Sequence, residues 1–413
     1  MPNVISLLIV SAAMIVGLKS GAAPNPLLSV GLLIVLAYLA SVMMKTLRLP
    51  AFIGYILTGM LAGPDGLSLV PEGFAARMSF VEALCVMLLV AETVRYLLDD
   101  TPAPASGRNL AIGAVSSFIT FLVVTGILAS SPAPLRIKVA LGLFASTFSP
   151  FVVYFYARRG NVSKDHVYIA FGGYLCALVL WGIMIAVFGP SGPHRIRIAF
   201  MPVMIGFTSL IAGISWAFLS ERFLYAFIRN QSGFHRIAAM FLIYPCAREL
   251  GLDFLFIAAG MGVYDGFISG RKTVGSEGSE PAWMFVFVLF GMGLSIGDTF
   301  TIGIQGWTLV VTVLVSMVFC RFTTLSLARK LFGTGTGPAS THAYAVVYGP
   351  LTFLLLRRFI PGLAYGSDWQ STGLSLLPVM TTTMMLTVVL AAVIQAVANT
   401  YGEKSGADTM NES

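Results

Sequence analysis

Two apolar segments of this chain, each long enough to cross a bilayer, carry a proline in the middle. The first is LGLFASTFSPFVVYFYARR (residues 141–159), and the second is AYAVVYGPLTFLLLRR (residues 343–358). Proline removes a backbone donor and turns the residue before it away from helical geometry. Because lipid cannot satisfy the freed carbonyls, a break at that depth belongs inside protein or beside a watery cavity. Paired breaks in corresponding positions of two halves are typical of the binding site of a secondary transporter.

The composition indicates an all-α polytopic membrane protein. Of 413 residues, 57% are hydrophobic and 10% are charged, and the mean hydropathy is +0.87. The formal net charge of +7 reflects basic loops rather than a nucleic-acid patch, so we expect no nucleic acid as a partner. No nucleophile, nucleotide-loop or zinc signature is present, and the four histidines have no ligand spacing. The sequence therefore predicts no enzyme, no cofactor and no metal site.

Apolar segments of spanning or near-spanning length predict about 13–14 transmembrane helices. They cover residues 4–18, 27–47, 50–64, 78–98, 107–130, 136–158, 166–188, 196–228, 234–249, 252–270, 281–298, 304–330, 338–360 and 371–399. The first is either retained or a cleaved signal peptide, and the lack of a basic residue before it favours retention. With the N-terminus inside, most Lys and Arg residues stand at inner ends. We therefore expect both termini in the cytoplasm, and the protein in the bacterial inner (plasma) membrane.

The two halves of the chain repeat each other. Ile56–Met60 matches Ile257–Met261 at an offset of 201 residues, and Pro150 matches Pro350 at an offset of 200. Five segments of one half then match five of the other, and an odd number of helices starts the two units on opposite membrane faces. We therefore predict inverted five-helix repeats with two crossed discontinuous helices. The predicted units are N-terminal helices 1–49, a first repeat 50–190, linking helices 191–250, a second repeat 251–400 and a polar cytoplasmic tail 401–413.

The groups around the two breaks are the first part of the candidate site. Half-helices that end at midplane present positive amides and negative carbonyls, and nearby hydroxyls add ligands for an ion or a small solute. The candidate residues are Ser146, Thr147, Ser149, Pro150, Tyr348, Gly349, Pro350 and Thr352. The alternative is a pair of simple proline kinks whose hydroxyls bond to their own helices.

Ionisable residues inside the apolar segments are the second part, because such residues are costly in lipid and are by default functional. Arg321 lies within the segment 304–330, and its alternative role is to snorkel to the inner interface. Glu92 is the candidate proton carrier. Its alternative role is a structural ion pair with Arg95, three residues further along the same helix.

Several motifs, taken in order, resemble the cation/proton antiporter superfamily, in its sodium/proton exchanger and glutathione-gated potassium-efflux branch. The residues that carry the resemblance are LRLPAFIGYILTGMLAGPDGL (47–67), FASTFSPF (144–151), ELGLDFLFIAAGMGVYDG (249–266) and FVLFGMGLSIGD (287–298). The resemblance covers roughly residues 28–400. It implies a sodium/proton antiporter-like fold, movement of a small ion or solute across the lipid bilayer, and a homodimer. Other membrane subunits are a further possible partner.

The resemblance breaks at the residues that carry the chemistry of that family. Its members have an aspartate in the helix after the first crossing helix, which binds the cation and exchanges it for protons. That place falls near Ala177-Leu178, and nothing acidic lies between His166 and Glu221. A later glutamate of the family corresponds to Leu351, and its core lysine, which pairs with the acid, corresponds to Arg321.

A basic centre without its acidic partner changes what the site can bind. A monovalent cation beside Arg321 would meet a like-charge repulsion on the order of several kcal/mol even at an effective dielectric of about 20. An anion or a polar neutral solute fits better. The first functional hypothesis is a secondary transporter of the antiporter fold with a non-standard ion site, in which ordinary cation/proton exchange would need another acid. The alternative is a transport-inactive homologue that acts as a sensor, scaffold or subunit of a membrane complex.

Overall fold

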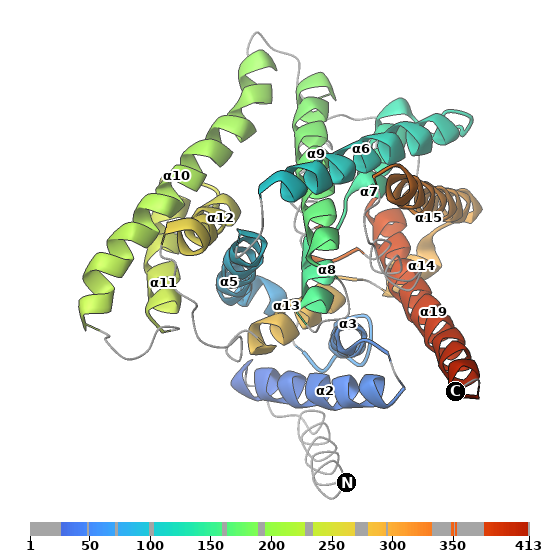
Figure 1. The fold of residues 1–413 in the computed structure, drawn as a ribbon, viewed down its shortest axis with the longest axis horizontal. Coiled ribbons are helices and arrows are strands. Elements are labelled where there is room, and N and C mark those ends of the chain that lie inside the picture. The colour runs from blue at the N-terminus through green and yellow to red at the C-terminus, as the bar shows by residue number, and fades with distance from the viewer. Residues whose placement is uncertain are drawn as a thin grey trace, which may run out of the picture.

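The protein is all-helical in the part of the chain that the structure describes (Figure 1). The structure is a computed structural model. It describes residues 26–47, 49–70, 73–98, 103–158, 163–188, 195–227, 234–268, 280–294, 296–332, 348–350, 352 and 376–411. The predicted first helix, 4–18, and most of the segment 338–360 lie outside these residues.

The helices follow the predicted apolar segments closely. In chain order they are α2 (Pro26–Thr46), α3 (Ala51–Ala62), α4 (Phe74–Arg77), α5 (Ser79–Leu98), α6 (Ala103–Leu128), α7 (Leu135–Ser146), α8 (Pro150–Ala157), α9 (Lys164–Phe188), α10 (Arg195–Phe227), α11 (Phe234–Glu249), α12 (Phe254–Val263), η1 (Tyr264–Ile268), α13 (Glu280–Met292), α14 (Ile296–Thr301), α15 (Ile304–Phe332) and α19 (Leu376–Asn411). Seven of the described helical spans are long and apolar enough to cross a membrane.

The first proline break is present as predicted. The segment 136–158 forms two helices, α7 and α8, separated by three extended residues, 147–149. Pro150 stands at the first position of α8, where its missing N–H costs nothing and its fixed φ suits a helix start. Every residue is buried in the apolar window found within Leu135–Ala157. The freed backbone groups are therefore enclosed by protein, as a break at membrane depth requires.

The segment 252–270 also departs from a plain helix. Asp253 caps its start, because its carboxylate accepts a hydrogen bond of 2.8 Å from the Leu255 amide. Asp253 is only 6% exposed. The segment ends in the π-helical turn η1, from which the Tyr264 hydroxyl donates to Glu221 Oε2 of α10 at 2.7 Å. That bond ties the end of this segment to α10.

The helices pack in the reciprocal way that two related halves require. Helix α3 of the first half packs on α13 of the second, and α12 of the second half packs on α5 of the first. The third helices of the two predicted five-helix units, α6 and α15, pack on each other. Outside these pairs, α2 covers α3 and α10 covers α12. The described helices thus form two halves that pack on each other, with α7 and α8 enclosed in the protein.

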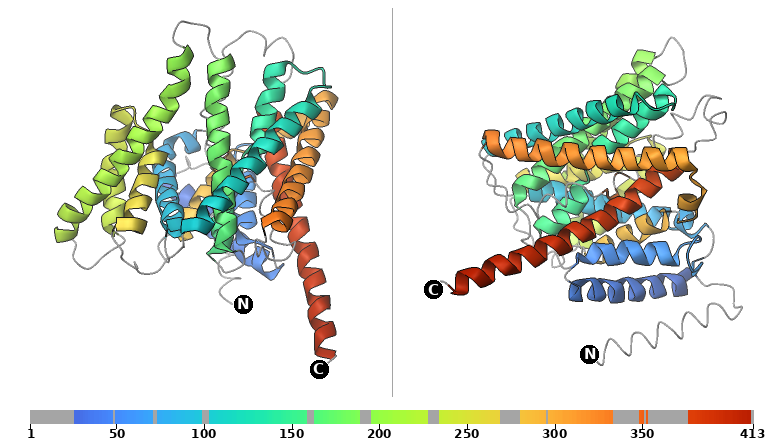
Figure 2. Two further views of the ribbon diagram at one scale, coloured as in Figure 1. Left: turned by 45° about the horizontal axis from the view of Figure 1, so that its top comes forward. Right: turned by 90° about the vertical axis from the view of Figure 1, so that its right-hand side faces the viewer.

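The outer helices expose apolar side chains, as lipid contact requires. Figure 1 shows α10 with α11 and α12 at one side of the molecule, and α15 and α19 at the other. Exposed large apolar residues of α10 are Val203, Met204, Phe207, Ile211, Phe218, Leu219 and Phe223. At the C-terminal end, α19 continues as helix through Asn411 into the predicted polar tail, and it extends past the other helices (Figure 2).

The contact between α3 and α13 gives a test of the packing. A Cβ added at Gly59 would overlap the carbonyl oxygen of Val288, which is backbone and cannot rotate away. We expect Gly59→Ala to lower the melting temperature of the full chain in detergent by about 3–10 °C, the range typical of overpacking. Gly126→Ala in α6 is the control, since no atom lies within 4 Å of its Cβ position. Equal melting temperatures for the two variants would contradict this close contact.

Candidate functional site

The two proline breaks meet in space. Ser149 Oγ lies against Gly349, where a Cβ would overlap this hydroxyl and approach Val152 Cγ2 to 3.0 Å. The rings of Phe144 and Tyr348 stack with their centroids 4.3 Å apart and their planes at 17°. Residues some 200 positions apart in the sequence therefore form one crossing, which is named here by its described residues Phe144–Pro150, 348–350 and 352.

The side chain of Arg321 on α15 reaches into this crossing. It is 0% exposed, so the alternative of snorkelling to the inner interface is wrong. Its Nη2 donates to the carbonyl oxygens of Ala145 and Thr147, at 2.8 and 2.5 Å. The carbonyls of the last helical turn lack amide partners when the chain becomes extended. Arg321 thus caps the C-terminal end of α7, where the helix dipole is negative.

Two aromatic rings surround the guanidinium. Its central carbon lies 4.4 Å from the ring centroid of Phe148 and 5.3 Å from that of Tyr348. A desolvated cation gains on the order of 2 kcal/mol from such a ring, and a hydrogen bond to a charged group contributes about 1.5–3 kcal/mol. These contacts offset the several kcal/mol that burying a charge costs.

The hydroxyls of the first break divide into two classes. Ser146 Oγ and Thr147 Oγ1 both donate to the carbonyl of Leu143, at 2.7 and 3.0 Å. For Ser146 and Thr147 the structure agrees with the alternative role, because their hydroxyls bond to a carbonyl of their own helix rather than to a ligand site. Their backbone is what contributes to the crossing, since the Ser146 carbonyl accepts a 2.9 Å bond from Ser117 Oγ of α6.

Three other hydroxyls at the crossing have no hydrogen-bond partner among the described residues. They belong to Ser149, Tyr348 and Thr352, which are 2%, 0% and 1% exposed. Thr352 is held near the break by its amide, which donates to the Gly349 carbonyl at 3.0 Å. Buried hydroxyls normally find a partner, so an unpartnered cluster calls for an explanation. Pro150 and Pro350 supply no side-chain ligand and act by creating the breaks.

The helix expected to carry an acid passes beside the crossing without one. On α9, a Cβ at Gly173 would overlap the ring of Phe148. One turn further along, at the place where the resemblance implies an aspartate, stands the fully buried Ala177. The sequence has no Asp or Glu in 101–164, 166–220 or 299–367, the stretches that contain α6 to α8, nearly all of α9, α15 and both breaks.

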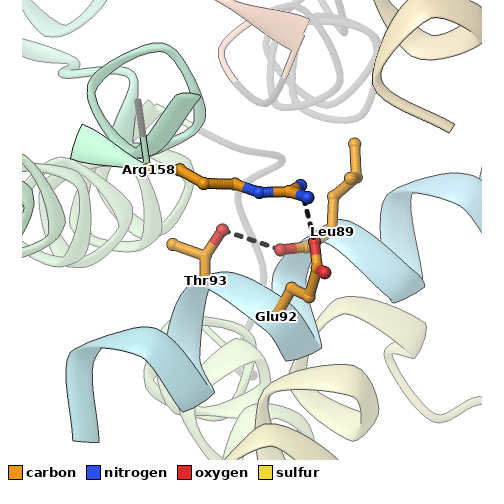
Figure 3. A network of polar contacts seen from close by, with 4 residues as sticks. All are labelled: Leu89, Glu92, Thr93 and Arg158. Atoms are coloured by element: carbon orange, nitrogen blue, oxygen red, sulfur yellow. Dashed lines mark hydrogen bonds and ion pairs between the residues drawn. The ribbon is translucent and has the colours of Figure 1, made fainter. Parts of the chain in front are cut away.

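Glu92 of α5 lies away from the breaks. Its Oε2 is 4.0 Å from Arg158 Nη1, which follows the last residue of α8 (Figure 3). The expected pairing with Arg95 on its own helix is therefore not the ion pair that the structure shows. Pro150 begins α8 at the crossing and the helix is eight residues long, so about 12 Å of helix separates the pair from the first break. The two side chains are 19% and 22% exposed, which fits an ion pair near a helix end.

Sequence reasoning missed the contribution of α6. Besides the bond from Ser117, Ser116 Oγ lies 2.6 Å from Thr324 Oγ1 of α15. Two adjacent serines within a spanning segment were the available signal, because hydroxyls there have to find partners on their own or a neighbouring helix. Together these bonds place α15, and with it Arg321, against the end of α7.

Comparison with known proteins supports the helical fold. The family model described as "Sodium/hydrogen exchanger, transmembrane" matches residues 31–398. Two similar solved structures are of the sodium proton antiporter MjNhaP1 from Methanocaldococcus jannaschii. A structure at pH 8 has a TM-score of 0.60 at 13% identity, and an electron-microscopy map has 0.63 at 14%. Each match covers 89% of this chain and 94% of the other. No curated protein sequence matches the chain.

Removing the Arg321 guanidinium tests its structural role. We expect Arg321→Met to lower the melting temperature of the full chain by about 5–10 °C, because it leaves the Ala145 and Thr147 carbonyls buried without a donor. Arg321→Lys should recover part of the loss, since an ammonium donates to carbonyls but lacks the planar group that stacks on Phe148. The exposed Arg77 on α4 provides the control variant Arg77→Met. An Arg321→Met protein as stable as the wild type would contradict the capping of α7.

Proposed function

Because the chain belongs to the sodium/hydrogen exchanger family, we propose that it is a secondary transporter of the monovalent cation/proton antiporter fold with a non-standard ion site. Family membership and the apolar helices make it an integral membrane protein. The proposal concerns the site. Its support is the fully buried Arg321 that donates to two carbonyls at the break.

These two contacts weigh against a bare cation at the same carbonyls. Carbonyls at the end of an unwound helix are natural ligands for Na⁺ or K⁺. Here one guanidinium nitrogen donates to both oxygens, at 2.8 and 2.5 Å. A second positive charge at about 4 Å from the guanidinium would cost roughly 4 kcal/mol at an effective dielectric of about 20. The arginine therefore takes the place of an exchangeable cation.

The stretches that form the crossing also lack an acidic side chain that could carry the proton in ordinary cation/proton exchange. The candidate carrier Glu92 faces Arg158 at the far end of α8. Ordinary cation/proton exchange is therefore not the activity that this arrangement favours.

One observation favours the alternative, a transport-inactive member of the family that serves as a sensor, scaffold or subunit of a membrane complex. Arg321 joins α15 to the end of α7 through two hydrogen bonds and an aromatic contact. An internal cap of this kind holds the break in one shape. Transport requires the site to change between at least two conformations, which a fixed cap opposes. This alternative is therefore tested together with the proposal.

The remaining features of the proposal follow from the sequence and the family. We propose that the protein lies in a bacterial inner membrane with both termini in the cytoplasm, on the distribution of Lys and Arg. A homodimer is proposed from the family resemblance. The family is one of transporters, so we propose no enzymatic activity and no cofactor.

Reconstituted vesicles with an internal pH dye test the absence of cation/proton exchange. We expect Na⁺ or K⁺ gradients to move no more protons with the wild-type chain than in protein-free vesicles, because the site has a resident positive charge and no acid. Glu92→Gln should leave this baseline unchanged. A cation-driven dye signal that Glu92→Gln abolishes would establish an altered antiporter instead.

Transport itself needs a positive result from the same preparation. On a solid-supported membrane, concentration jumps of inorganic anions should produce currents, and labelled polar neutral solutes should be taken up if they are the cargo. Movement of any of these above protein-free vesicles supports the secondary transporter. If no cation, anion or neutral solute moves, the transport-inactive alternative replaces it.

A further inference from the structure

The residue that precedes α8 makes no side-chain capping hydrogen bond at the N-terminal end of this helix. Ser149 occupies the capping position, yet its side chain makes no capping hydrogen bond. The first amides of a helix have no acceptor within the helix, and a serine oxygen at this position normally accepts from one of them. The helix has eight residues, with Pro150 at its first position. A positive helix end therefore faces the crossing without the acceptor that its sequence offers.

Three buried hydroxyls belong to residues of the crossing. The hydroxyl of Ser149 lies against Gly349, in the turn that also holds Tyr348 and Thr352. All three hydroxyls are at least nine-tenths buried and have no partner among the described residues. The ring of Tyr348 lies between Phe144, on which it stacks, and the guanidinium of Arg321. Each hydroxyl can donate one hydrogen bond.

The C-terminal end of α7 and the N-terminal end of α8, on either side of residues 147–149, differ in their capping. The negative end of α7 is capped by Arg321. For the positive end of α8, the stretches 101–164 and 299–367, which hold both prolines, offer no carboxylate. The crossing therefore holds one full positive charge, one uncapped positive helix end and a group of unpartnered donors. A negative ligand satisfies all of these at once.

We propose that the crossing binds one small monovalent inorganic anion of the halide class, held by the hydroxyls of Ser149, Tyr348 and Thr352 in the field of Arg321 and the start of α8. This inference rests on the proposed function and names the class of ion for that same site. The anion is monovalent because the site carries one formal charge. It is small because the surrounding residues are completely buried.

The test measures halide binding to the purified full chain, apart from transport. Sodium chloride or bromide, titrated against sodium gluconate at constant sodium, should raise the melting temperature in a saturable way. Ser149→Ala and Tyr348→Phe should each weaken the apparent halide affinity about tenfold, the effect of losing one hydrogen bond to a charged group. The matched control is Ser220→Ala, because Ser220 Oγ is buried but donates to the Ala217 carbonyl of its own helix.

Bromide also gives a direct location. A crystal of the wild-type chain grown in bromide should show anomalous density within contact distance of Ser149 and Tyr348, and this result decides the matter if the variants fail to fold. The proposal is overturned if halides do not stabilise the wild type, if both variants respond as Ser220→Ala does, or if the bromide lies elsewhere. Halide binding here without flux of any solute would overturn the proposed transport but keep the site. Flux of another solute without halide binding would overturn the site alone.

Discussion

The arrangement at the centre of this protein depends on two hydrogen bonds from one nitrogen of Arg321. They end on the carbonyls of Ala145 and Thr147, where α7 stops inside the bundle. A helix cannot stop at membrane depth unless its last carbonyls find donors, because lipid offers none. The guanidinium supplies those donors, and the rings of Phe148 and Tyr348 lie beside it. The break, the aromatic contacts and the buried charge therefore form one unit.

Surrounding helices are arranged to support this unit. Reciprocal packing of α3 on α13 and α5 on α12 encloses the discontinuous helices from both sides. Helix α6 adds hydroxyl bonds to α7 and lies against α15 through Ser116 and Thr324. Each of the helices that frame the crossing is thus connected to another one by a polar contact or a close backbone approach.

The sequence predicted the course of the chain better than the use of its side chains. Apolar length and the first proline predict the described helices and the break between α7 and α8, because these properties are local. The burial of Arg321 was one of two open alternatives, and only the packing of α15 decides it. Ser146 and Thr147 were selected for their hydroxyls, but their carbonyls lie at the crossing, since a helix pattern does not say which group bonds within the helix. The partner of Glu92 is on another helix, which no spacing within α5 reveals.

A tethered cation differs from a soluble one in its effective concentration. An ion at the end of α7 would come and go with the salt on either side of the membrane, whereas a guanidinium on α15 is held at the carbonyls by its own chain. The shape of the broken helix is then decoupled from the ionic composition of the surroundings. A protein built in this way keeps the same central architecture in sodium-poor and sodium-rich media.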